Sequence, residues 1–298
     1  MPPLIAAALV VLTLTACQGS PTAGQEMDQG TGRSTASAAT GTEPADAAAV
    51  TLPPTNGQFD YQLGTAYALD GGLDVVVRDA TAQPAADAYN ICYVNGFQTQ
   101  PGQADLWLDG NEDLLLHDAA GELVVDPDWP DEYILDPSTE AKRGRILDLL
   151  GPVITGCAAA GFDAVEIDNL DTWTRFTEPS TGLIEKDAAL ALASAYIDVA
   201  HEAGLAIGQK NAAEATTAGR ELGFDFAVTE ECAAYDECDA YTRVYGENVL
   251  QIEYTDNLPD GFDAVCAGAD RAPLTILRDR DLVGPDDEAY AYQQCASR

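Results

Sequence analysis

Short apolar runs alternate with helix-forming segments along residues 59–278, and this alternation restricts the possible folds more than any other feature. Repeated strand–helix–strand units of this kind build a parallel sheet. The candidate strands are 59–63, 74–78, 89–95, 133–136, 164–169, 206–210, 224–230, 249–254 and 274–278. A closed (β/α)8 barrel needs one strand fewer. We therefore expect an α/β protein with a single (β/α)8 TIM-type barrel and one accessory strand, the alternative being an open doubly wound sheet.

Two of the intervening helices have recognisable ends. The first is predicted to begin at Asp136, with Pro137 at the first helical position, and to continue through Leu150. The second is predicted over 185–203, and Gly204 ends it. No glycine-rich phosphate loop follows any candidate strand, which argues against a nucleotide-binding sheet.

The N-terminus has the features of an export signal. The apolar run 4–14 is too short to span a bilayer, and the letters LTAC that end at Cys17 resemble a bacterial lipobox. We predict a lipoprotein signal peptide over 1–17 with lipidation of Cys17, the alternative being an ordinary secretory signal. Residues 18–55 are predicted to be a disordered tether, because they contain almost no large apolar residues, and 56–298 the folded domain. The protein is then an extracellular, bacterial cell-surface lipoprotein that meets the membrane only through its lipid.

The folded part contains an even number of cysteines, which in an exported protein predicts disulfide bonds. The favoured pairs are Cys232–Cys238, Cys266–Cys295 and Cys92–Cys157. The first is the most local bridge, the second fixes the C-terminus, and the third uses the remaining residues; other pairings stay open. A zinc site is the competing interpretation, but the chain has no CxxC pair and only 2 histidines.

The chain carries 50 acidic and 14 basic residues, a formal net charge of −36. Such a charge disfavours nucleic acid and other polyanions as partners and favours a cationic ligand, which the negative field would attract. Solubility in a saline or acidic setting is the other explanation of the same charge.

Carboxylates lie at the end of the candidate strand 164–169. Alternation places the apolar Val165 and Ile167 on the helix side, so Glu166 and Asp168 face the barrel interior, with Asp168 nearer its mouth. Catalytic groups of such barrels collect at the C-terminal ends of the strands. An inward carboxylate is costly unless it is paired or functional, so both acids are candidates for the site.

A second pair of acids follows the strand 224–230. Alternation counted from Ala227 and Thr229 turns Glu231 inward and Glu230 outward. Side-chain alternation is least regular where a strand ends, so both glutamates remain candidates.

The strand 206–210 places a cation near these acids. Two acids brought together at the strand ends are the equipment for cleaving a glycosidic bond. Lys210 is therefore expected to hold a carboxylate ionised, to donate to a sugar hydroxyl, or to pair with Glu166. Asn211 follows it as a second candidate for substrate binding. Further candidates for sugar contacts at strand ends are Tyr93, Asn95 and Tyr254.

Several segments together resemble glycoside hydrolase family 114, the endo-α-1,4-polygalactosaminidases. They are FDYQLG (59–64), YNICYVNGFQTQ (89–100), GFDAVEIDNLD (161–171), GQKNA (208–212) and FDFAVTEECAAYDEC (224–238). The resemblance covers most of 59–295 and implies a secreted (β/α)8 enzyme that cuts galactosamine-rich exopolysaccharide within the chain. The acid of the family's DN motif matches Asp168. The glutamate of its EEC motif matches best at Glu230, whereas alternation favours Glu231.

The predicted function is therefore endo-acting hydrolysis of an α-1,4-linked, cationic, galactosamine-containing polysaccharide. Asp168 would attack the anomeric carbon, and Glu230 would protonate the leaving oxygen and then activate water. We expect no metal, no organic cofactor and a monomer. The alternative is a surface lipoprotein that binds a polycationic glycan without cutting it.

Overall fold

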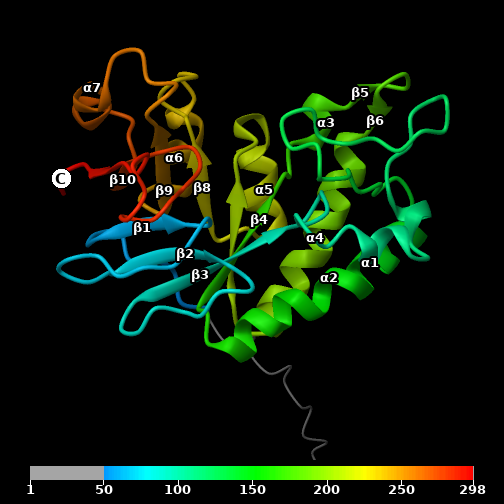
Figure 1. Ribbon diagram of the computed structural model, residues 1–298, viewed down its shortest axis with the longest axis horizontal. Coiled ribbons are helices and arrows are strands. Elements are labelled where there is room, and N and C mark those ends of the chain that lie inside the picture. The colour runs from blue at the N-terminus through cyan, green and yellow to red at the C-terminus, as the bar shows by residue number, and fades with distance from the viewer. Residues whose placement is uncertain (1–49, 298) are drawn as a thin grey trace, which may run out of the picture. The chain divides into compact units, whose positions relative to one another are not determined.

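The structure, a computed structural model, describes residues 50–297. A nine-stranded sheet forms its centre, in the order β1-β2-β3-β4-β7-β8-β9-β10-β11 (Figure 1). The strands are β1 (Phe59–Gln62), β2 (Val75–Asp79), β3 (Tyr89–Asn95), β4 (Ala164–Asp168), β7 (Ala206–Lys210), β8 (Phe226–Glu230), β9 (Val249–Tyr254), β10 (Leu274–Arg278) and β11 (Tyr292–Gln294). Every neighbouring pair from β1 to β10 is parallel, whereas β11 is antiparallel to β10.

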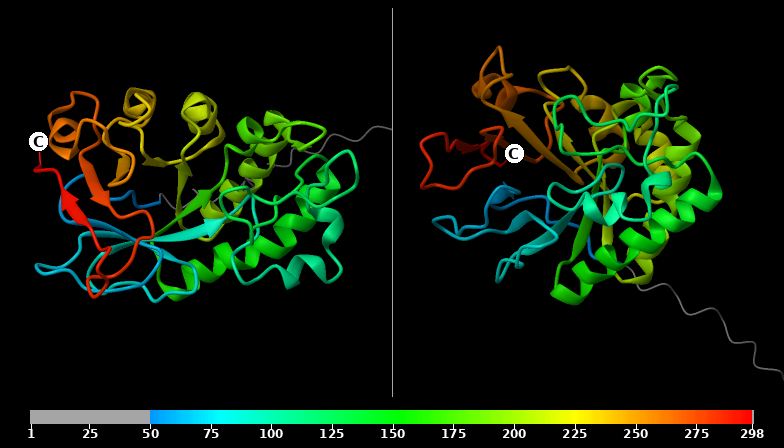
Figure 2. Two further views of the ribbon diagram at one scale, coloured as in Figure 1. Left: turned by 45° about the horizontal axis from the view of Figure 1, so that its top comes forward. Right: turned by 45° about the vertical axis from the view of Figure 1, so that its right-hand side comes forward.

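The sheet curves into a nearly closed barrel whose two edges meet through side chains. Tyr292 of β11 donates a hydrogen bond from its hydroxyl to the carbonyl of Phe59 at 2.8 Å. Nη1 of Arg278 lies 2.8 Å from Oδ1 of Asp60, and both side chains are fully buried. Figure 2 shows β11, in red, beside the blue β1. The expected TIM-type α/β barrel is therefore confirmed, with β11 as an added strand at the seam.

Alternating side chains divide the core into two parts. One cluster fills the barrel interior and includes Tyr61, Ala164 and Phe226. The other lies between the sheet and the helices and includes Val165 and Ile167. The predicted orientation of strand 164–169 is confirmed, so Glu166 and Asp168 point into the barrel.

Eight of the nine candidate strands are barrel strands. The prediction of a strand at 133–136 is wrong, because this segment forms only isolated bridges within the long connection from β3 to β4. Its apolar residues Ile134 and Leu135 are fully buried in the cluster beneath the helices, which explains the apolar run. The sequence analysis missed β11 and the short hairpin of β5 (Thr177–Glu178) and β6 (Gly182–Leu183), which have no comparable apolar run.

The helices are α1 (Asp105–Leu108), α2 (Glu140–Ala160), α3 (Thr172–Arg175), α4 (Lys186–Glu202), α5 (Thr216–Leu222), α6 (Cys238–Tyr245) and α7 (Phe262–Ala267), with 3-10 turns at Glu112–Leu114 and Ala213–Ala215. Figure 1 shows α2 and α4 side by side, and these two helices pack against β3, β4 and β7. Within residues 50–297, only loops connect β1 to β2 and β2 to β3. The barrel is therefore less regular than a full (β/α)8 repeat. Nowhere in this part of the chain is there a helix of the length and apolar character that a membrane crossing requires.

One predicted helix start is wrong. The helix α2 begins at Glu140, and its N-cap is Thr139, whose hydroxyl accepts a hydrogen bond from the Lys142 amide at 3.2 Å. Asp136 instead stabilises the preceding turn by accepting from the Ser138 amide at 2.9 Å. The second helix is confirmed as α4, and Gly204 follows it with a φ of 78°.

The three favoured disulfide pairs are all present. They are Cys92–Cys157, Cys232–Cys238 and Cys266–Cys295. The first joins β3 to α2, the second closes the loop after β8, and the third ties α7 to the C-terminal segment. Each bridge therefore fastens a peripheral element beside the sheet.

The predicted signal peptide 1–17, the lipidation at Cys17 and residues 18–49 of the predicted tether lie outside the described residues. The last residues of the predicted tether contact the barrel. Val50 packs against the interior cluster, and the Tyr89 hydroxyl donates to the carbonyl of Thr51 at 2.5 Å. We propose that the folded domain includes Val50 and Thr51, which the predicted tether contained.

Candidate active site

A cleft of about 490 Å³ opens at the C-terminal ends of the barrel strands. Seven of the nine residues predicted to act on the substrate line it: Tyr93, Asp168, Lys210, Asn211, Glu230, Glu231 and Tyr254. They come from β3, β4, β7, β8 and β9 or from the residues directly after these strands. In a parallel barrel these ends share one face, which explains why residues far apart in the sequence meet here.

The orientation of β8 decides between the two glutamates. Phe226 and Val228 belong to the barrel interior and Ala227 to the helix side, so Glu230 points inward. The alternation that favoured Glu231 was counted from Ala227, which lies on the helix side, so the prediction that Glu231 points inward and Glu230 outward is wrong. Glu231 follows the strand with a φ of 61°, which turns its side chain away from the strand's inward row.

Lys210 connects the two inward acids. Its Nζ lies 3.3 Å from Oδ1 of Asp168 and 3.0 Å from Oε2 of Glu230, and its side chain is only 1% exposed. Burial alone would lower the pKa of the ammonium, but the surrounding carboxylates, Asp168 first, raise it above its usual value. The site therefore contains a permanent buried cation between two carboxylates.

Three donors hold Asp168 in a fixed orientation: Lys210, the Tyr93 hydroxyl and the Asn169 backbone amide. Tyr93 donates its hydroxyl to Oδ2 at 2.7 Å, and the Asn169 amide donates to Oδ1 at 2.9 Å. Burial would raise the pKa of Asp168, but Lys210 and these hydrogen bonds outweigh it and hold the pKa below its usual value. The carboxylate is thus ionised and suited to act as a nucleophile.

Glu230 has different partners. The Tyr254 hydroxyl donates to Oε1, and the side-chain amide of Asn211 donates to Oε2 at 3.2 Å. Oδ1 of the Asn211 side chain also accepts from the backbone amide of Glu230 at 2.8 Å, which fixes the end of β8 beside that of β7. Tyr254 and Asn211 therefore determine where the Glu230 carboxyl group lies.

Glu166 was a candidate for the site, but it is not among the residues that line the cleft. It is fully buried below Lys210, and the Tyr61 hydroxyl joins the two: it donates to Oε1 of Glu166 at 2.7 Å and accepts from Nζ of Lys210 at 2.8 Å. Burial raises the pKa of Glu166 to about 8, although Lys210 opposes the shift. Glu166 thus supports the floor of the site through Tyr61.

Residues 39–298 match the glycoside-hydrolase family GH114. The chain belongs to this family. It is therefore a glycoside hydrolase, as the resemblance of its motifs predicted. No curated protein matches the chain in sequence.

Two solved structures share the fold of this GH114 chain. Ega3 of Aspergillus fumigatus, in a crystal structure with galactosamine, superposes with a TM-score of 0.64 at 20% identity, over 83% of this chain and 98% of that one. The glycoside hydrolase domain of PelA from Pseudomonas aeruginosa superposes with a TM-score of 0.50 at 15% identity, over 76% of this chain and 95% of that one. These likenesses support the barrel assignment.

Glu231 lines the GH114 cleft but is held at its rim. Nη2 of Arg280 lies 2.7 Å from its Oε1, and Asn257 donates to the same oxygen at 2.9 Å. The Arg280 guanidinium also stacks 4.5 Å from the centre of the Tyr254 ring. Glu231 therefore positions Arg280, and through it Tyr254.

Asn95 lies next to the cleft instead of lining it. Its side-chain Nδ2 donates to Oε2 of Glu132 at 2.8 Å, and its side-chain Oδ1 accepts from Nδ2 of Asn169 at 2.9 Å. Asn95 thereby joins the residue after Asp168 to the loop that carries Trp129 and Glu132. The sequence analysis missed the cleft residues Trp129 and Glu132. The sequence did contain a sign of them, a tryptophan in an otherwise Pro-rich and acidic segment, DPDWPDE (126–132).

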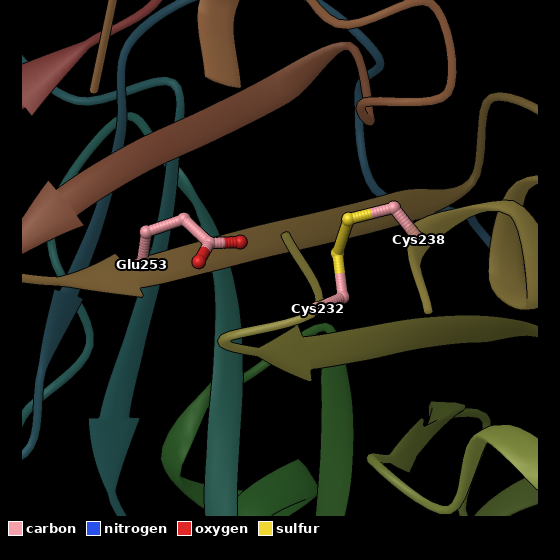
Figure 3. A group of neighbouring side chains, drawn as sticks. All are labelled: Cys232, Cys238 and Glu253. Carbon is pink, nitrogen blue, oxygen red and sulfur yellow. A yellow bond between two sulfur atoms is a disulfide. The ribbon is translucent and has the colours of Figure 1, made fainter. Parts of the chain in front are cut away.

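Within residues 50–297, only Cys232, Cys238 and Glu253 bring three potential metal-ligand atoms within 4.8 Å of one another. Figure 3 shows Glu253 beside the disulfide that joins the two cysteines. A disulfide lacks the thiolates that zinc binding needs. The competing zinc interpretation therefore finds no support in this cluster.

Proposed function

We propose that this GH114 hydrolase is exported and cuts α-1,4-linked galactosamine-rich polysaccharide within the chain, with Asp168 as nucleophile and Glu230 as acid and base. One observation carries the assignment: Lys210, almost fully buried, contacts both carboxylates at 3.3 and 3.0 Å. Two carboxylates at one point of a cleft are the groups that glycosidic bond hydrolysis requires.

The two contacts of Lys210 limit how far apart the carboxylates can lie, and a retaining mechanism is compatible with this limit. Retaining enzymes hold the two groups roughly 5–5.5 Å apart and inverting enzymes roughly 6.5–9.5 Å apart. Because Nζ of Lys210 lies 3.3 Å from one oxygen and 3.0 Å from the other, these oxygens are at most 6.3 Å apart, the sum of the two contacts. This limit concerns the two oxygens that face Lys210, and it is compatible with the carboxyl separation of a retaining enzyme.

The two steps of the reaction then follow. Asp168 forms a bond to the anomeric carbon while Glu230 gives its proton to the glycosidic oxygen, and the bond to the leaving sugar breaks. Glu230 next removes a proton from water, whose oxygen displaces Asp168 from the sugar. Lys210 and Tyr93 stabilise the ionised Asp168 before attack and after release.

A cationic substrate fits the charge of both the chain and the cleft. The formal net charge is −36, and Asp79, Glu132 and Asp171 add carboxylates to the wall of the cleft. Galactosamine units that are not acetylated carry positive charge, so the field attracts such a polymer. Ega3, which shares the fold, was crystallised with galactosamine.

We also propose that the enzyme works outside the cell, as a lipoprotein anchored at Cys17. Three disulfide bonds fit an oxidising compartment. The signal-like residues 1–17 and the lipobox-like letters before Cys17 support export and the anchor.

The test is release of reducing ends from a de-N-acetylated α-1,4-galactosamine polymer. We expect activity in the wild type and a loss on the order of 10³-fold or more in Asp168→Asn and in Glu230→Gln. Glu231→Gln is the matched comparison, with a loss of less than about tenfold because Glu231 only positions neighbours. A wild-type protein that binds the polymer without cutting it would favour the non-catalytic alternative instead.

A further inference from the structure

The loop formed by residues 126–132 presents two unassigned side chains to the cleft. Trp129 and Glu132 both line it. Trp129 is 52% exposed, whereas the other two tryptophans, Trp107 and Trp173, are 2% and 9% exposed. A large ring at the wall of a glycan cleft is suited to contact ligand when about half of its surface is left open to solvent, as it is here.

The loop is fixed in position by a buried carboxylate. Asp126, 1% exposed, forms an ion pair with Arg175 and accepts from the Gln98 amide group at 2.8 Å. Its other oxygen accepts the backbone amides of Asp128 at 2.9 Å and Trp129 at 3.3 Å. The Trp129 ring is therefore held on a prearranged backbone, which lowers the entropy lost when a ligand binds.

Two backbone hydrogen bonds close the loop around Glu132. The Glu132 amide donates to the carbonyl of Trp129, and the Asp126 amide donates to the carbonyl of Glu132, both at 2.9 Å. Pro127 and Pro130 restrict the backbone further. The separation between the ring and the carboxylate is thus set by the loop itself.

Glu132 is 7% exposed, and Asn95 occupies only its Oε2. Burial raises the pKa of Glu132 to about 7, the Asn95 hydrogen bond opposes the shift, and the negative charge of Asp168 adds to it. A cation bound beside this carboxylate would interact strongly with its negative charge, because water screens a buried charge only weakly. Asn95 also links Glu132 to Asn169, the residue directly after Asp168, so Glu132 lies near the proposed nucleophile.

We propose that the 126–132 loop recognises the ammonium group of a galactosamine unit bound on the Asp168 side of the cleft. Glu132 forms the ion pair, and the Trp129 ring packs against the sugar and the ammonium charge. The inference rests on the proposed function and adds selectivity: an N-acetylated unit offers no cation to Glu132, so the loop favours de-N-acetylated stretches of polymer.

The test measures binding in an Asp168→Asn background, so that the oligosaccharide is not cut. Calorimetry compares α-1,4-linked galactosamine oligomers with their N-acetylated forms. We expect Glu132→Gln, which keeps an oxygen for Asn95, to weaken binding of the galactosamine oligomer about tenfold or more and to leave the acetylated oligomer within about twofold. Asp131→Asn is the matched control, since it removes the same charge from an exposed neighbour that does not line the cleft.

Trp129→Ala provides a second variant, at an exposed position where misfolding is not a concern. It should weaken binding of both oligomers, and of the galactosamine form more. Equal losses for the two oligomers in Glu132→Gln, or an unchanged preference, would overturn the inference. Turnover by the wild type separates this inference from the proposed function. If the wild type cuts the polymer but Glu132→Gln keeps the same preference for the galactosamine oligomer, only the role of the loop is refuted. If the wild type does not cut the polymer, the proposed function is refuted.

Discussion

The buried Glu166 makes the stability of this protein depend on pH in an unusual direction. Its carboxyl group is fully buried, and Oε1 accepts from Tyr61 at 2.7 Å. Oε2 finds no hydrogen-bond partner among residues 50–297. Burial raises its pKa from 4.5 to about 8. The native state therefore keeps this proton at neutral pH, while the unfolded chain releases it.

The sign of the effect follows from proton binding. Between the unfolded and the native pKa the native state binds more protons, so the stability due to Glu166 is complete below about pH 4.5 and is lost as the pH rises to about 8. Each pKa unit corresponds to about 1.4 kcal/mol, so the change from pH 5 to pH 8 is on the order of 4 kcal/mol. Glu166→Gln removes the titrating group and with it this dependence.

The assay is urea unfolding of the wild type and Glu166→Gln at several pH values from 5 to 8. We expect the free energy of unfolding of the variant, relative to the wild type, to rise by a few kcal/mol across this range. Glu221→Gln, the same substitution at an exposed position in α5, reports the effect of the amide alone. A difference between Glu166→Gln and the wild type that stays constant with pH would refute the account of the buried proton.

Two further predictions concern the cation and one disulfide. Lys210→Met should lower kcat/KM on the order of 10²-fold or more. It should also move the acidic limb of the pH–rate profile to higher pH, because Asp168 loses the positive charge that keeps its pKa low. An acidic limb at the wild-type pH would contradict this role of Lys210. Replacing both Cys232 and Cys238 by Ser should lower the free energy of unfolding by about 2 kcal/mol, the value for a short closed loop, and unchanged urea midpoints would show that the bridge does not stabilise the fold.

Much of the barrel could be predicted because most of its strands coincide with short apolar runs in the sequence. The orientation of β4 followed from Val165 and Ile167, which the structure places on the helix side. The orientation of β8 was missed although the information was present: Phe226 and Val228 are bulky enough to fill a barrel interior, whereas the small Ala227 packs under a helix. Side-chain size was thus a better guide to β8 than position at the strand end.

Other features depend on contacts between distant residues and left no local pattern. Arg278 and Asp60 meet at the seam of the barrel across 218 positions of the chain. Glu132 enters the cleft only because Asp126 folds its loop back, and the acid itself looks like any surface carboxylate. The family resemblance identified Glu230 but gave no sign of this loop.

The most direct test of the central claim is the product that azide forms with Asp168→Ala and Glu230→Ala, identified by NMR on an α-galactosaminide with an activated leaving group. If Asp168 is the nucleophile and Glu230 the acid and base, azide replaces Asp168 and gives the β-azide in the first variant. In the second it intercepts the sugar bound to Asp168 and gives the α-azide. The opposite assignment of products, or no azide product from either variant, would contradict the account.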